Sequence, residues 1–191
     1  MQLKILLKRK PLIIILSGFA FSLGLVLLFT TSTTAFYKQE QLGVVGLPVR
    51  FKIPKIKVDA MVDYVGLTSG GAVDVPKGPS NVAWFDLGPR PGEEGSSIID
   101  GHSGWKNNIQ AVFDNLYKLK KGDKIYVQDD KGATISFVVR VIRTYNPKAD
   151  ASSVFNSIDG KAHLNLIACT GVWNAIEKTH SERLVVFADK E

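Results

Sequence analysis

Three side chains lie at the ends of strand-forming runs of the sequence, and their types suit acyl-transfer chemistry. Cys169 closes one apolar run, His102 closes another, and Arg183 opens a third. A partly ionised thiol is a good nucleophile, and a nearby His⁺ or Arg⁺ lowers its pKa. A histidine can protonate a leaving amine and later take a proton back, while an arginine offers fixed donors to a developing oxyanion. Together, the three types favour cysteine-based chemistry at a rim held by a rigid sheet.

The spacing of these residues supports only part of that arrangement. If the strands that carry them are antiparallel neighbours, the fourteen-residue step from Cys169 to Arg183 brings thiol and guanidinium together. His102 must arrive through the fold. His163, in a polar turn, and His180, in an expected loop, compete for the histidine role, and periodicity does not choose among the three. Taken singly, each residue also fits a plain structural role, such as a buried core cysteine or a solvated arginine.

The elements that must position these residues are mostly short β-strands. Turn signals rich in Gly, Pro, Asn and Asp separate the strand-forming runs. One segment has helical periodicity, with apolar residues at three- and four-residue steps over 109–119 and Lys120-Lys121-Gly122 closing it. Many short strands with one modest helix predict a mainly β fold, either a closed barrel or a sandwich. The expected strands are 50–53, 58–65, 82–84, 97–100, 124–128, 134–145, 164–168 and 184–188.

Charge and hydropathy set the N-terminal part of the 191-residue chain apart. Residues 11–29 carry no charge, and the cations of the first 35 residues all precede them. A membrane span needs roughly 20 apolar residues, and the positive-inside rule places the basic end in the cytoplasm. A signal peptide cleaved near Ala35 is the alternative. The expected parts are a cytoplasmic basic tail 1–10, a transmembrane anchor 11–30, a linker 31–48 and an extracytoplasmic domain 49–191 at the cell membrane.

The composition excludes several classes of protein and site. The formal charge is +6, of which +4 lies in residues 1–35, so the main domain is nearly neutral and nucleic-acid binding is disfavoured. A single cysteine excludes an intrachain disulfide and a Cys-rich metal site. The acidic pairs Glu93-Glu94 and Asp129-Asp130 are interpreted as solvated charges rather than cation ligands. We therefore expect neither a metal nor a cofactor.

Beyond these patterns, the chain resembles the sortases, which are membrane-anchored cysteine transpeptidases of Gram-positive and related bacteria. The resemblance covers nearly the whole chain, and its specific part runs from Val82–Phe85 through Pro91–Ser96 to His102, followed by Cys169 and Arg183. It implies a closed eight-stranded barrel with one or two short helices and with the three residues at one rim. It also implies that Cys169 is the nucleophile, His102 a general acid and base, and Arg183 the stabiliser of substrate and oxyanion.

The sequence departs from the family pattern next to the proposed nucleophile. Sortases usually read Thr-Leu-x-Thr-Cys, and here Asn165 and Ala168 replace the two threonines, so no hydroxyl directly precedes the thiol. A second C-terminal membrane segment and a long lid insert, which the pilus-polymerising class would suggest, are not found in the sequence. The resemblance is therefore to the shorter sortases of the D, E and F classes.

The resemblance predicts a sortase-type transpeptidase. It would cleave a C-terminal sorting signal of secreted proteins through a thioacyl-enzyme and pass the acyl group to an amine acceptor of the cell envelope. Two alternatives remain open: an extracytoplasmic cysteine peptidase that releases its substrate to water, and a non-catalytic, membrane-tethered β-barrel binding module. The residues expected to contact the substrate are Ala168, Thr170, Trp105 and Trp173, the last in a short loop at 172–181.

Overall fold

The computed structural model describes residues 44–176 and 179–191. The predicted basic tail, the predicted anchor and most of the predicted linker lie outside these residues. Within the described ranges, no helix is long and apolar enough to cross a membrane.

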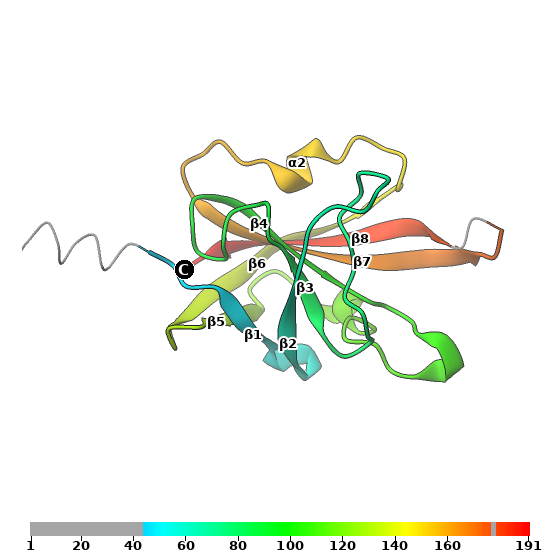
Figure 1. The fold of residues 1–191 in the computed structure, drawn as a ribbon, viewed down its shortest axis with the longest axis horizontal. Helices are drawn as coiled ribbons and strands as arrows, with labels where there is room; N and C mark the ends of the chain where they lie inside the picture. Colours follow the sequence, from blue (N-terminus) through cyan, green and yellow to red (C-terminus); the bar gives the residue numbers. More distant parts are fainter. Residues whose placement is uncertain (1–43, 177–178) are drawn as a thin grey trace, which may run out of the picture. The chain divides into compact units, whose positions relative to one another are not determined.

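Eight strands close into a barrel in the order β1-β2-β3-β4-β7-β8-β6-β5 (Figure 1). The β2–β3 and β4–β7 ladders are parallel, and the remaining ladders are antiparallel. Each predicted strand corresponds to an observed one, so the prediction of a mainly β, closed eight-stranded barrel is confirmed. The strands are β1 Pro48–Ile53, β2 Val58–Val65, β3 Val82–Phe85, β4 Gly95–Gly101, β5 Lys124–Asp129, β6 Thr134–Tyr145, β7 Ala162–Asn174 and β8 Thr179–Lys190.

Strands β7 and β8 are longer than the sequence predicts. Trp173 lies opposite His180 in their ladder, so most of the predicted loop at 172–181 belongs to a hairpin. The predicted polar turn around His163 is likewise the beginning of β7. The hairpin end of the two strands is held by backbone pairing and not by buried side chains, since Val172 and Trp173 are exposed. A prediction based on hydrophobic alternation therefore stops too early.

The predicted helix over 109–119 is wrong. The segment forms turns that end in the 3₁₀ turn η3, Leu116–Lys118. Two of its backbone N–H groups bond outside the segment, Val112 to the Pro79 carbonyl and Phe113 to the His102 carbonyl, whereas a helix over 109–119 would direct the Phe113 N–H to the Ile109 carbonyl. Its apolar spacing instead reflects burial, since the segment packs Ala111, Phe113, Leu116 and Leu119 into the core.

The helices that do form are short. The only α-helix among the described residues is α2, Ser152–Phe155, in the β6–β7 connection. Two further 3₁₀ turns, η1 at Pro54–Ile56 and η2 at Lys106–Asn108, complete the set. Single turns of this length have no apolar stripe that a sequence pattern would reveal.

Two apolar clusters fix which way each strand faces. The larger fills the barrel and includes Leu164, Leu166 and Ala168 of β7. The smaller lies on the outer face of β4, β7 and β8, where Val154 of α2 covers it (Figure 1). Because strand side chains alternate, the residues of β7 between the inward ones face outward, and Cys169 is among them.

Of the acidic pair at 129–130, Asp130 is exposed as predicted, but Asp129 is not. Asp129 is 5% exposed, and its carboxylate accepts hydrogen bonds from the backbone N–H groups of Gly46, Lys131 and Ala133. It therefore fastens the segment before β1 to the β5–β6 turn. In the described part of the chain, no group of three or more His, Cys, Asp or Glu side chains is placed to hold a metal ion.

Candidate active site

Cys169 and Arg183 lie opposite each other on adjacent strands. The antiparallel β7–β8 register pairs these two residues, and two residues along each strand it pairs Ile167 with Val185. Directly opposite residues have Cβ atoms about 4.5–5.5 Å apart and point to the same face of the sheet. The predicted approach of thiol and guanidinium is confirmed, because the two strands are neighbours in the expected register.

His102 reaches the same rim through the parallel β4–β7 ladder. Gly101 lies opposite Ala168, so the next residues, His102 and Cys169, come at the same level of neighbouring strands. A side chain at Gly101 would collide with Phe113, since a Cβ there would lie 2.4 Å from the Phe113 ring. The glycine thus lets Phe113 pack closely, and the Phe113 N–H holds the His102 carbonyl at 2.9 Å. Segment 109–119, which the sequence predicts as a helix, therefore supports His102.

One nitrogen of the His102 ring is already engaged. His102 Nε2 lies 2.8 Å from the carbonyl oxygen of Pro76, so this nitrogen carries a proton and donates it. The Trp105 ring packs 4.6 Å from the imidazole, between ring centres, and fixes its plane. In the neutral ring Nδ1 is then the acceptor, and it has no hydrogen-bond partner among the described residues. His102 therefore has one nitrogen available for proton transfer.

Strand β8 itself holds the Arg183 guanidinium. Nη1 donates to the carbonyl oxygens of His180 at 3.1 Å and Glu182 at 3.0 Å, and Nη2 donates to the Thr179 hydroxyl at 2.9 Å. A guanidinium has five N–H donors, so two remain without a partner among the described residues. The arrangement fixes the orientation of the charge and leaves donors for a ligand.

The Cys169 thiol is protonated at rest. Burial raises its pKa above the usual 9.0, Arg183 opposes that change, and Asp100 adds to it. At pH 7 less than about 1% of such thiols is ionised. The sequence correctly predicts the direction of the arginine's effect, but burial outweighs it. Forming the thiolate therefore requires a base, and His102 lines the same hollow as the thiol.

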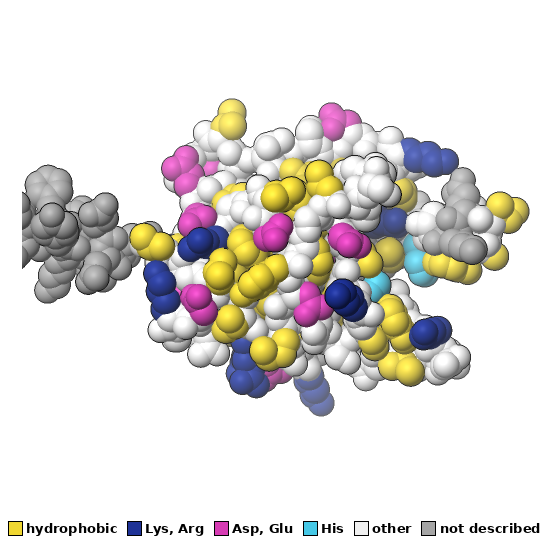
Figure 2. All heavy atoms as spheres, viewed as in Figure 1, with side chains coloured by type: hydrophobic (Ala, Val, Ile, Leu, Met, Phe, Trp, Pro, Cys, Tyr) yellow, Lys and Arg dark blue, Asp and Glu magenta, His cyan; other side chains and the backbone are white. Residues whose placement is uncertain are grey.

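Two hollows meet at Cys169. One, of about 750 Å³, contains His102, Trp105, Trp173 and His180. The other, of about 540 Å³, lies against the outer apolar cluster and is lined mainly by apolar side chains, together with Asp100. Cys169, Arg183 and Val75 line both. Figure 2 shows histidine side chains in the hollow between the β7–β8 hairpin and the segment that follows β4. The thiol thus borders open space in both hollows.

The structure separates the four residues predicted to contact substrate. Trp105 and Trp173 line the larger hollow, and Trp173 packs against His180 with ring centres 5.2 Å apart. Thr170 lines neither hollow. The Ala168 side chain is 1% exposed and belongs to the barrel core, because Ala168 and Cys169, as strand neighbours, face opposite sides of the sheet. Its side chain therefore lines neither hollow, and its contact with substrate stays a prediction.

Some residues of the site were absent from the sequence prediction. Val75 lines both hollows and the Pro76 carbonyl holds His102, yet their segment has no periodicity or charge pattern that would mark it. Asp100, two residues before His102, appeared only as part of a strand. The sequence predicts a loop around His180, the rival histidine, whereas this residue lies in β8 and lines the larger hollow.

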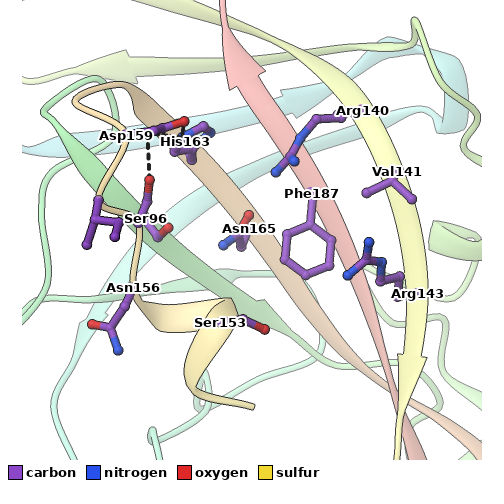
Figure 3. Close-up of a pocket in the computed structure, with 12 residues that line it drawn as sticks. Ser96, Arg140, Val141, Arg143, Ser153, Asn156, Asp159, His163, Asn165 and Phe187 are labelled. Carbon is purple, nitrogen blue, oxygen red and sulfur yellow. Dashed lines mark hydrogen bonds and ion pairs between the residues drawn. The ribbon is translucent and has the colours of Figure 1, made fainter.

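His163, the other rival histidine, lies in a separate polar cluster near the start of β7 (Figure 3). Its Nδ1 is 2.8 Å from Asp189, its Nε2 is 2.9 Å from Asp159, and Arg140 pairs with Asp189 at 3.2 Å. Nearby, Asn165 donates to the Val154 carbonyl at 2.6 Å and so fastens α2 to β7. His163 is 6% exposed, and both of its nitrogens are occupied, so it does not serve the thiol.

Comparison with known proteins relates this geometry to a family. The family model for the sortase domain matches residues 51–191. No curated protein sequence matches the chain.

Solved structures agree with the family match. The chain is similar to sortase C-1 from Actinomyces oris, with 28% identity over 75% of this chain and 74% of that one and a TM-score of 0.60. It is similar to a pilus-related sortase C of Group B Streptococcus, with 25% identity, 80% and 71% coverage and a TM-score of 0.59. A lid mutant of sortase A from Corynebacterium diphtheriae shares the fold at 24% identity, 79% and 73% coverage and a TM-score of 0.59. The predicted D, E or F subtype stays a prediction. The match of the family model over residues 51–191 shows that the chain belongs to the sortase family.

Proposed function

We propose that this protein is a cysteine transpeptidase that cleaves a C-terminal sorting signal of secreted proteins and joins the new carboxyl end to an amine of the cell envelope. The observation that carries the proposal is the cross-strand pair of Cys169 and Arg183, which shares a hollow with His102. Membership of the sortase family supports the reaction class.

In the first half-reaction, His102 Nδ1 takes the thiol proton and Cys169 attacks the scissile carbonyl. A C–S bond forms, and the carbonyl oxygen becomes an oxyanion. The remaining donors of Arg183 stabilise this charge, because they are fixed and stay protonated at every working pH. His102 then protonates the leaving nitrogen as the C–N bond breaks, which leaves a thioester on Cys169.

In the second half-reaction, an amine attacks the thioester. The new C–N bond forms as the C–S bond breaks, and His102 takes the proton of the incoming amine. One acyl bond replaces another, so the reaction needs no cofactor or nucleotide. Separate hollows on the two sides of the thiol suit a peptide donor and an amine acceptor that approach in turn.

We also propose that residues 11–30 anchor the enzyme in the cell membrane with the catalytic domain outside. The uncharged run and the cations before it support this placement. An anchored enzyme would meet secreted substrates as they emerge.

Mass spectrometry of the intact domain with a library of sorting-signal peptides tests the proposal. We expect an acyl adduct on Cys169 whose mass identifies the cleaved bond, and a peptide–amine product when an amine is added. Release to water at the same rate with and without amine would favour a cysteine peptidase. No adduct from any peptide, with Cys169 also inert to thiol reagents, would favour the binding module.

A further inference from the structure

Asp100 is an acidic residue on the catalytic face of the barrel to which the reaction described above assigns no role. The β4–β7 register places it opposite Ile167, one step from Gly101 and Ala168, so it is the diagonal neighbour of Cys169. It lies two residues after Ile98 of the outer cluster and so faces the same side of β4, and it lines the smaller hollow together with Cys169 and Arg183. The carboxyl therefore faces the same space as the nucleophile.

The Asp100 carboxyl lacks a partner in the part of the chain that the structure describes, where it has neither a hydrogen bond nor an ion pair. Burial raises its pKa to about 7, and Arg183 opposes that change. Among the described residues, no hydrogen bond or ion pair joins it to Arg183, whose guanidinium donates to Thr179, His180 and Glu182 and keeps two further donors. The Asp100 carboxyl and the spare donors of Arg183 thus lie near the Cys169 thiol without bonding to each other.

Ionising this carboxyl is costly for the folded protein, because burial disfavours the charged form. The side chains around it are mainly apolar, including Phe85, Tyr145, Val154 and Val185. A polar group in such surroundings without a hydrogen bond destabilises the folded protein. Groups of this kind concentrate where a ligand completes their bonding.

A bound peptide would supply the missing bond. Each peptide group has an N–H donor and a C=O acceptor that point in opposite directions. A pocket that binds extended peptide through mainly apolar walls gains its register from a few polar contacts. Asp100 offers an acceptor for a peptide N–H group, and Arg183 offers donors for a peptide carbonyl.

We propose that Asp100 is a positioning residue of the acyl-donor site, where its carboxyl accepts a hydrogen bond from a backbone N–H of the peptide while Arg183 donates to a carbonyl. The inference rests on the proposed function. The two contacts fix the peptide along the smaller hollow, so that one carbonyl carbon lies over Cys169. The ligand class is an extended peptide segment, and its nearest backbone N–H is the group recognised.

The test uses the library peptide that acylates Cys169 most rapidly and analogues of it with one backbone amide N-methylated at a time. Acylation of wild type is compared with that of Asp100→Leu, which removes the acceptor, and of Asp100→Asn, which keeps an acceptor oxygen. Asp86→Asn, at an exposed carboxyl outside both hollows, is the control.

We expect one N-methyl analogue to lose about 10- to 100-fold in kcat/KM with wild type. The Leu variant should show the same loss with the unmodified peptide and no further loss with that analogue, while the Asn variant recovers part of the rate. Folding and thiol access are read separately from iodoacetamide labelling, which should be faster in the Asn variant above pH 7 because a negative charge beside Cys169 is removed.

Two results would overturn the role of Asp100 and leave the proposed function intact: wild-type acylation rates in the Leu variant, or methylation losses that are equal in wild type and variant at every position. Failure of every peptide to acylate wild type, with Cys169 still labelled by iodoacetamide, would overturn the proposed function and this role with it.

Discussion

The β7–β8 ladder carries two polar clusters that differ in how many of their groups are paired. Near the start of β7, His163 bonds to Asp159 and Asp189, and Asp189 also pairs with Arg140. Six residues further along, or about 20 Å of strand, the cluster around Cys169 has open positions. There, within the part of the chain that the structure describes, Arg183 keeps spare donors, His102 keeps a free acceptor nitrogen, and the carboxyl of Asp100 has no partner.

Both clusters contain residues that a search for catalytic chemistry would choose. Polar groups in protein interiors are ordinarily paired, so the closed cluster fits a stabilising role. The open cluster surrounds a nucleophile and borders two hollows, which is where unpaired groups gain a function. The pattern of unmade bonds, more than the residue types, distinguishes His102 from His163.

Replacing the nucleophile should remove the chemistry and leave the fold. With Cys169→Ala we expect no acyl adduct and no peptide cleavage above background, because no other thiol exists in the chain. The side chain is only partly buried, so the melting temperature should stay within about 3 °C of wild type. Intact-mass and thermal-melting measurements check both. A folded alanine variant with normal turnover would exclude Cys169 as the nucleophile.

The geometry of the arginine should matter more than its charge. Arg183→Lys keeps the charge but replaces a planar fork with a single ammonium, which cannot reproduce donors aimed at an oxyanion. We expect a loss in acylation rate of about 10²–10³ with normal folding and thiol labelling. Arg143→Lys, in β6 and outside both hollows at Cys169, is the control and should change turnover little. Activity of Arg183→Lys within a few-fold of wild type would leave a Cys–His pair without the arginine.

The unpaired Asp100 should make stability fall as pH rises. Its pKa in the folded protein is raised to about 7 from 3.8, so between about pH 4 and pH 7 the folded state holds a proton that the unfolded state has lost. Stability that is present below pH 4 is lost across this window. Relative to Asp100→Asn, we expect wild type to lose about 2–3 kcal/mol between pH 5 and pH 8, measured by urea unfolding. Parallel pH profiles for the two proteins would show that Asp100 ionises normally in the fold.

Opening the closed cluster should affect stability alone. His163→Gln loses one of two carboxylate contacts of a buried ring, and we expect a loss of about 1–2 kcal/mol in unfolding free energy. Acylation at 25 °C should remain within about two-fold of wild type, because no group of this cluster lines the hollows at Cys169. A large loss of activity in a fully folded His163→Gln protein would remove the distinction between the clusters.

The sequence predicts the framework of the site better than its details. Alternation of apolar and polar residues and turn signals locate all eight strands. The fourteen-residue step from Cys169 to Arg183 predicts the pairing of these two residues. The route of His102 was open, since it depends on a parallel pairing of β4 with β7 across about sixty residues that no local pattern encodes. Only the resemblance to sortases selected this histidine over the other two.

The errors have local physical causes. The segment at 109–119 buries apolar residues at helical spacing, but tertiary hydrogen bonds such as Phe113 to His102 outweigh its helical preference. Strand β7 extends past the apolar pattern because the ladder continues as an exposed hairpin. Asp100 went unnoticed because a single acid within an apolar run gives no signal until its neighbours across the sheet are known.

We claim that Cys169 accepts an acyl group and passes it to an amine. The most direct measurement is the fate of the acyl adduct after excess peptide is removed, followed by intact-mass spectrometry with and without added amine. We predict a stable thioester on Cys169 that disappears faster as the amine concentration rises, with the peptide–amine conjugate as the product. An adduct on another residue, or one whose loss is independent of amine, would contradict the claim.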